Sequence, residues 1–198
     1  MAQTLLKMLN ATQPANKLSE SALLVIDAQR EYLDGKLPLV NIDAALDQIS
    51  GLLERARKQK TKIFFVRHSV GSGAPIFNPD SQYFQIIDRV KPNSGETIID
   101  KSQANSFADT DLQELLDKTG LKKLIVTGFM THACVSATVR SAAERGFNTT
   151  VIAGACATRD LPSADGATVQ ASEIHKATLA ALQDLFATIV PEQNLISD

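Results

Sequence analysis

The chain alternates between short apolar runs and longer segments in which apolar residues recur every three or four positions. Runs with the length and composition of buried strands occupy residues 22–26, 61–66, 97–100, 121–127 and 149–153. Segments with helical spacing occupy residues 43–60, 110–118, 132–145 and 164–185. Residues 187–190 predict a last edge strand, which Pro191 ends.

This order of elements predicts the fold class. Strands that alternate with helices are typical of an α/β protein with an open, mostly parallel sheet and helices on both faces. A length of 198 residues gives one domain with a substantial core, for which we expect residues 21–198. Residues 1–20 predict an N-terminal arm whose apolar side docks on the domain or on a second subunit.

Composition excludes several function classes. The net charge of -2 predicts no basic face, so we expect no nucleic-acid partner. No apolar run is long enough to cross a bilayer, and the N-terminus lacks the pattern of a signal peptide. Two cysteines, without a CxxC or HExxH motif, do not make a disulfide scaffold. We therefore expect a cytoplasmic protein without a membrane partner.

The most informative stretch runs from the strand at 121–127 into the following helix. Gly128 is expected to break the strand, Thr131 to cap the helix, and Cys134 to lie in its first turn. Free N–H groups at a helix start favour an anion, so this position predicts a reactive thiolate. The alternative is a small buried side chain, which is our interpretation of Cys156.

Two more reactive side chains follow predicted strands. Asp27 ends the run at 22–26, and Lys101 follows the run at 97–100. Alone, Asp27 fits a turn cap and Lys101 a solvated lysine. Because the carboxyl ends of parallel strands meet at one edge of a sheet, we expect both to lie near Cys134. Asp27 would then accept the thiol proton, Lys101 would hold the site charged, and N–H groups of the turn would bind an oxyanion.

At this point the sequence resembles the isochorismatase-like cysteine hydrolases, a superfamily that includes nicotinamidase and N-carbamoylsarcosine amidohydrolase. The resemblance is carried by Asp27-Ala28-Gln29, by Asp100-Lys101 and by the turn from Gly128 to Val135. It implies a three-layer α/β/α sandwich, an Asp27–Lys101–Cys134 triad and a homo-oligomer, either a dimer or a tetramer. It also implies a cis peptide between Phe129 and Met130, with the N–H groups of Met130 and Cys134 as the oxyanion hole.

The resemblance narrows the chemistry. Isochorismatases proper cleave a vinyl ether and lack the cysteine, so Cys134 favours attack on an amide or carbamoyl carbonyl through a thioester. Nicotinamidases hold a metal on a D-x-H-x-x-H loop, whereas here His68 precedes Ser69-Val70-Gly71-Ser72-Gly73. We therefore expect no metal and no cofactor. Ether cleavage by Asp27 and Lys101 stays open, as does a non-catalytic or thiol-sensing role.

Substrate contacts follow less directly. The long segment Ser69–Gly95 is rich in glycine and proline, which is typical of a functional loop or an interface. We expect it to determine which small molecule binds, together with residues that a neighbouring subunit supplies. Arg159 and Asp160 fit an ion pair or a loop anchor. Candidate contacts, each of which also fits plain packing, are Gln29, Tyr32, His68, Phe107, Phe129 and His132.

Overall fold

The computed structural model describes residues 2–198 and is built on a six-stranded sheet. The strand order is β3-β2-β1-β4-β5-β8, and every neighbouring pair in it is parallel. The strands are β1 (Ala22–Ile26), β2 (Lys62–His68), β3 (Thr97–Lys101), β4 (Lys123–Phe129), β5 (Asn148–Ala157) and β8 (Thr188–Val190).

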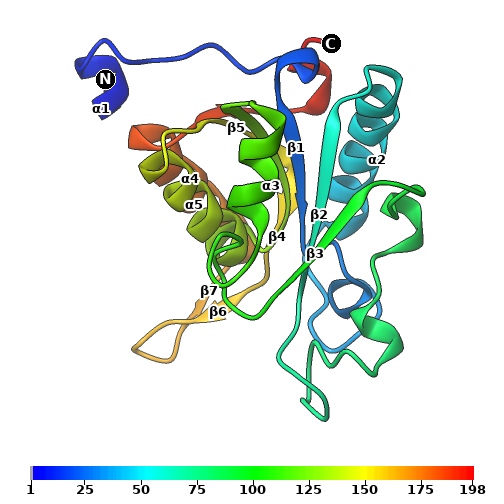
Figure 1. Cartoon of the computed structure of the whole chain (residues 1–198). Helices are drawn as coiled ribbons and strands as arrows, with labels where there is room; N and C mark the ends of the chain where they lie inside the picture. The colour runs from blue at the N-terminus through cyan, green and yellow to red at the C-terminus, as the bar shows by residue number, and fades with distance from the viewer. Residues whose placement is uncertain (1) are drawn as a thin grey trace.

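Helices cover both faces of this sheet and make three layers (Figure 1). One face carries α2 (Ile42–Lys58), and the other carries α3 (Leu112–Thr119), α4 (Ser136–Glu144) and α5 (Ala171–Leu185). Side chains of β1 alternate between the two resulting cores: Leu23 and Val25 pack toward α2, and Leu24 and Ile26 toward the other helices. An uninterrupted apolar strand is what burial on both faces requires. The predicted three-layer α/β/α sandwich is confirmed.

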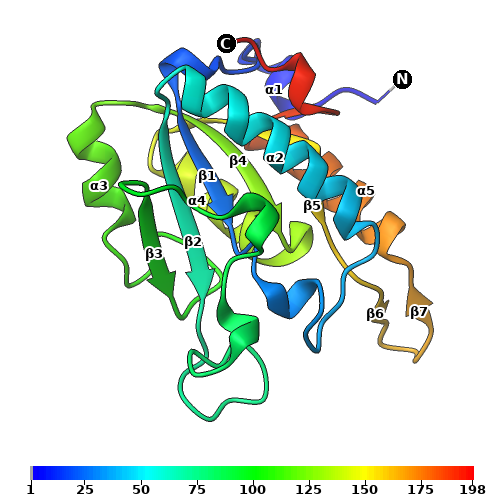
Figure 2. The same ribbon diagram turned by 90° about the vertical axis from the view of Figure 1, so that its right-hand side faces the viewer.

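The end of the molecule toward which the strands point carries different segments from the opposite end. Figure 2 shows β2 and β3 pointing toward the end that carries the loop between them and the hairpin of β6 (Leu161–Pro162) and β7 (Thr168–Val169). The short helix α1 (Leu5–Met8) and both termini lie at the opposite end. Within residues 2–198, no helix is both long enough and apolar enough to cross a membrane.

The N-terminal segment is fastened to its own domain. The side chain of Asn16 is buried and donates to the carbonyls of Leu124 and Asn148, at 3.0 and 2.9 Å. Farther along, the backbone N–H of Leu5 donates to Asp184 Oδ1 at 2.8 Å. Polar contacts thus fasten the segment to the domain, whereas Leu5, Met8 and Leu9 on its apolar side are exposed, so the surface on which that side docks stays a prediction.

Two element boundaries differ from the sequence prediction. Strand β5 runs on to Ala157, because Cys156 and Ala157 pair with the end of β4. Residues 164–170 form the hairpin turn and strand β7, not the first turns of α5. Gly166 adopts a φ of 85° there, and Asp165 bonds to Ser163 and to the N–H of Ala167, which closes the turn.

Gly128 lies inside β4, where we expected it to end the strand. It has a φ of 111° and sits at a shift in register between β4 and β5. A Cβ atom at this position would lie 2.0 Å from the carbonyl oxygen of Ile26. Only glycine therefore allows β4 to approach β1 closely just before the turn that carries Cys134.

Candidate active site

Three side chains from three strand ends meet in a buried site. Asp27 follows β1 with a φ of 50°, Lys101 is the last residue of β3, and Cys134 lies in the turn after β4. Lys101 Nζ is 2.8 Å from Asp27 Oδ2 and 3.3 Å from Cys134 Sγ. Neither the Lys101 nor the Asp27 side chain is exposed to solvent. The ammonium group thus connects the carboxylate and the thiol.

The turn that presents Cys134 is wound more widely than an α-helix. Residues Thr131–Val135 form a π-helical turn, in which the N–H of Val135 donates to the carbonyl of Met130 at 3.3 Å. The peptide bond between Phe129 and Met130 is cis. Within residues 2–198, the N–H of Met130 makes no backbone hydrogen bond. The Met130 N–H is therefore not used by the backbone, and its role in an oxyanion hole stays a prediction.

Thr131 does not cap the helix, contrary to our expectation from the sequence. Its hydroxyl is buried and donates to the carbonyl of Ala157 at 3.1 Å, and it lies 2.9 Å from His175 Nδ1. The N-cap position belongs to Met130. Because Thr131 faces the neighbouring strand and helix, its hydroxyl fastens the turn to β5 and α5 instead.

The electrostatics of the site correct a second expectation, that the helix start makes Cys134 a thiolate. Burial, and then the negative charge of Asp27, raise the pKa of the Cys134 thiol to about 12, although Lys101 acts in the opposite direction. Burial also raises the pKa of Asp27 above its usual value. The resting thiol is therefore protonated near pH 7, and Asp27 is a stronger base than an exposed carboxylate.

His68 lies on the other side of the ammonium group. Its Nδ1 atom is 3.3 Å from Lys101 Nζ. Burial and the nearby Lys101 charge lower the pKa of His68 to about 4, so the ring is neutral near pH 7. The ring packs edge-on against Phe77, with centroids 5.1 Å apart.

Two of the candidate substrate contacts have structural partners. Gln29 is fully buried: its amide donates to the carbonyls of His68 and Phe84, and its oxygen accepts from the N–H of His68. The Phe107 ring is buried and stacks on Phe147, with centroids 5.9 Å apart. Since these contacts occupy both side chains, we assign them positioning and packing roles instead of substrate contact.

The other candidates lie nearer to the triad. Tyr32 is 2% exposed and packs edge-on against Phe129; burial and the charges of Asp27 and Cys134 raise its pKa well above 10. His132 Nδ1 lies 2.6 Å from the hydroxyl of Thr158, and burial lowers the pKa of this histidine. Phe129 is fully buried. Substrate contact by Tyr32, His132 and Phe129 stays a prediction.

The sequence of almost the whole chain matches a known family. The model of the Isochorismatase domain matches residues 21–193. The chain belongs to the isochorismatase family. It is an isochorismatase-family hydrolase, and the resemblance drawn from the three motifs is confirmed.

Individual family members are similar over nearly their full length. A secreted isochorismatase effector of Verticillium dahliae is 39% identical over 95% of this chain and 96% of its own. Nicotinamidase 3 of Arabidopsis thaliana is 30% identical over 89% of this chain and 86% of its own. The crystal structure of an isochorismatase from Pseudomonas putida KT2440 superposes with a TM-score of 0.94 at 40% identity, and covers 99% of this chain and 100% of that one.

Arg159 was not among the substrate contacts that we predicted from the sequence. The positive charge of Arg159 acts to lower the pKa values of both Tyr32 and His132, although burial has the larger effect on each. Its Nη1 donates to the carbonyl of Asp160 at 3.2 Å, and its buried Nε has no hydrogen-bond partner among residues 2–198. A basic residue two positions beyond the end of β5 is the sequence signal for this placement.

The residues present do not form a metal-binding set. In the part of the chain that the structure describes, no three His, Cys, Asp or Glu side chains are grouped so that they could hold a metal ion. His68 precedes the segment in which nicotinamidases carry their metal ligands. Its Nδ1 atom, however, faces the Lys101 ammonium. A cation at that nitrogen would displace Lys101.

Proposed function

We propose that this protein hydrolyses the C–N bond of a small amide or carbamoyl compound through a thioester on Cys134. The observation that carries the proposal is the single ammonium group of Lys101, which touches both the Asp27 carboxylate and the Cys134 thiol. A nucleophile, a base and a charge that stabilises the ionised nucleophile are the parts that covalent acyl transfer needs.

In the acylation step, Cys134 Sγ attacks the carbonyl carbon while Asp27 accepts the thiol proton. Lys101 stabilises the negative charge that develops on sulfur, and the N–H groups of Met130 and Cys134 receive the negative charge on the carbonyl oxygen. When the tetrahedral intermediate collapses, the C–N bond breaks and Asp27 returns its proton to the leaving nitrogen. The amine or ammonia departs and the acyl group stays on sulfur.

In the second step, Asp27 takes a proton from a water molecule, which attacks the thioester carbon. The C–S bond breaks, the carboxylic or carbamic acid leaves, and Asp27 returns the proton to Cys134. The raised pKa of Asp27 supports this role, because a carboxylate that binds a proton more tightly is a better base. We propose that both steps run without a metal.

The relatives support a C–N bond as the target. Nicotinamidase 3 of Arabidopsis thaliana is named for the hydrolysis of an amide. We extend that reaction class, but not that substrate, to this chain. We propose that Arg159 favours substrates that carry an anionic group, since its buried Nε has no hydrogen-bond partner among residues 2–198 and its charge acts on both Tyr32 and His132.

Thiol sensing fits the site less well than catalysis. Cysteines that sense oxidants are exposed and have lowered pKa values. Cys134 is 6% exposed, and burial raises its pKa. Ether cleavage by Asp27 and Lys101 would give no reason for the contact between Lys101 and the thiol.

The test is intact-protein mass spectrometry after incubation with nicotinamide, N-carbamoyl amino acids, ureido acids and simple amides. Wild type is compared with Lys101→Ala, Asp27→Asn and Cys134→Ala. We expect an acyl adduct that accumulates in the slowed Lys101 and Asp27 variants and is absent from Cys134→Ala. Turnover of any of these compounds by Cys134→Ala at the wild-type rate would overturn the proposal.

A further inference from the structure

The geometry points to His68 as the positioning residue of Lys101: its neutral imidazole accepts the third N–H of the ammonium and so aims the other two at Asp27 and Cys134. This inference rests on the proposed function, because it explains how Lys101 is held for that reaction. It adds a fourth residue to the site, and neither the three motifs nor the family resemblance assigned it this role.

The ammonium group has three protons and three neighbours. Asp27 Oδ2 lies at 2.8 Å, Cys134 Sγ at 3.3 Å and His68 Nδ1 at 3.3 Å from Lys101 Nζ. The Lys101 side chain has no surface exposed to bulk solvent, and these three groups are the polar partners of its Nζ atom among residues 2–198. Without an acceptor at the His68 position, one N–H would be buried without a partner and the group would be free to rotate away from the thiol.

The ring of His68 is held in one orientation. His68 and Lys101 are register partners on the neighbouring strands β2 and β3, so the two side chains start side by side. The Phe77 ring packs edge-on against one side of the imidazole. The backbone of Gln103 also acts on the ring, in the direction that raises its pKa. When the ring proton is on Nε2, the Nδ1 lone pair is available to accept from Lys101.

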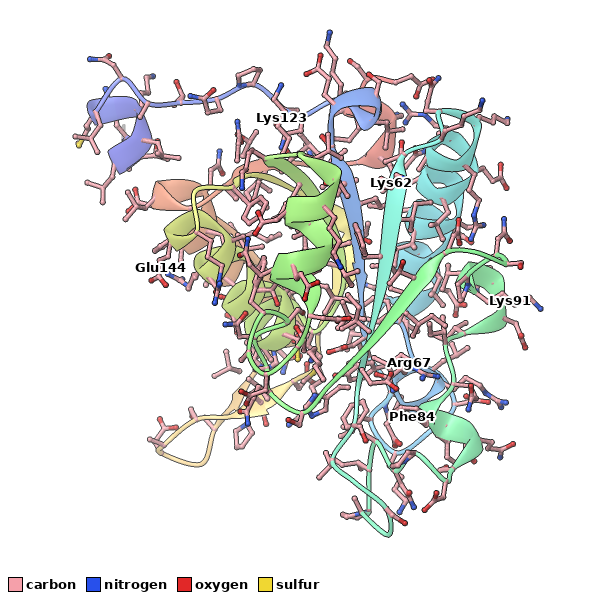
Figure 3. The ribbon with its side chains drawn as sticks, in the orientation of Figure 1. Lys62, Arg67, Phe84, Lys91, Lys123 and Glu144 are labelled. Carbon is pink, nitrogen blue, oxygen red and sulfur yellow. The ribbon has the colours of Figure 1, made fainter. Side chains whose placement is uncertain are left out.

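The backbone beneath the ring is fixed as well. Both the N–H and the carbonyl of His68 are bonded to the buried amide of Gln29. The guanidinium carbon of the preceding residue, Arg67, lies 4.5 Å from the centroid of the Phe84 ring, and its Nε forms an ion pair of 2.7 Å with Asp100. Figure 3 labels Arg67 and Phe84 next to each other. The position of Nδ1 is therefore set by contacts on both sides of β2.

An uncharged acceptor suits this position better than a carboxylate. A second carboxylate would offset the positive charge of Lys101, which the developing thiolate of Cys134 needs. An imidazole that accepts a hydrogen bond leaves the charge in place. Protonation of the ring would put two positive charges 3.3 Å apart and would displace Lys101.

The test compares His68→Leu, which removes the acceptor, with His68→Asn, whose carbonyl oxygen can take the place of Nδ1. The first readout is the rate at which iodoacetamide alkylates Cys134 as a function of pH, which needs no substrate. Trypsin separates the two thiols, because Cys134 lies in the peptide 124–140 and Cys156 in the peptide 146–159. Alkylation of Cys156 in the same sample is the internal control.

We expect His68→Leu to shift the alkylation curve of Cys134 to higher pH and to slow alkylation at pH 8 by about tenfold, the effect of one lost hydrogen bond to a charged group. His68→Asn should restore most of the rate. With an identified substrate, kcat should fall in His68→Leu with little change in KM. Thermal melts identify any variant that fails to fold.

Two results would overturn the inference. One is an unchanged alkylation curve in a folded His68→Leu variant. The other is an equal loss in His68→Leu and His68→Asn, which would mean that the ring only fills space. If no compound is hydrolysed but the alkylation curves separate as expected, the proposed function fails while the link from His68 through Lys101 to the thiol is supported.

Discussion

Lys101 and Asp27 form an ion pair of 2.8 Å in which neither side chain reaches solvent. Removal of one partner leaves the other charge buried, whereas removal of both leaves none. A double variant should therefore regain the stability that a single variant loses, but it cannot regain activity, because both reactive groups are gone.

We predict that Lys101→Met lowers the free energy of unfolding by about 3–5 kcal/mol, the usual cost of an unpaired buried charge. The double variant Asp27→Asn/Lys101→Met should regain much of that stability but no turnover. Urea denaturation and a steady-state assay measure the two quantities. Equal stability of the single and double variants would mean that Asp27 gives up its charge when Lys101 is absent.

Cys134 and Cys156 make a matched pair for testing covalent catalysis. Both are buried, and burial raises the pKa of each thiol to about 12. We predict that Cys134→Ala abolishes turnover and that Cys156→Ala keeps it within about threefold, since a substitution that does not touch the reacting atoms changes the transition state little. A comparable loss in both variants would point to a structural effect.

The same thiols predict how stability depends on pH. An unfolded thiol ionises near pH 9, while each folded one keeps its proton to about pH 12. Above pH 9 the folded chain holds more protons, so stability falls as pH rises, by up to about 1.4 kcal/mol per pH unit for each thiol. Denaturation between pH 8 and 10.5 should show a shallower slope for Cys156→Ala than for wild type, and identical slopes would argue against the shift.

Gly128 and Gly120 differ in what surrounds them. Both have a positive φ, but a Cβ atom at Gly128 would lie 2.0 Å from the carbonyl oxygen of Ile26, and nothing lies within 4 Å at Gly120. We predict that Gly120→Ala costs about 1 kcal/mol through its backbone conformation alone. Gly128→Ala should cost at least about 4 kcal/mol or prevent folding, because β1 and β4 would have to separate. Thermal melts compare the two variants.

The sequence pattern was sufficient for the layers and for the convergence of Asp27, Lys101 and Cys134, because each lies at or just beyond the carboxyl end of a parallel strand. The sequence pattern gave wrong element boundaries where strand pairing or a turn determined them. Strand β5 extends through Gly154 and Cys156 because β4 continues beside it. The sequence predicted a helix from Ala164, but the turn at Gly166 delays the start of α5 to Ala171.

The sequence also did not predict which side chains surround the triad. The position of His68 beside Lys101 depends on the register of β2 and β3. The effect of the Arg159 charge on the pKa of Tyr32 depends on how segments far apart in the sequence come together. The state of Cys134 was misjudged because a helix start was weighed without the burial of the thiol. Burial is a property of the assembled domain, and no short motif reports it.

The loop between β2 and β3 is tied down at a few points near Gln29 and Glu31. Gln29 holds His68 and Phe84, and the buried carboxylate of Glu31 accepts from the N–H of Phe77 at 3.1 Å. Between these ties the chain from Ser69 to Ile76 carries none of the triad residues. A change of sequence in this stretch therefore leaves the reactive atoms on the strand ends that hold them.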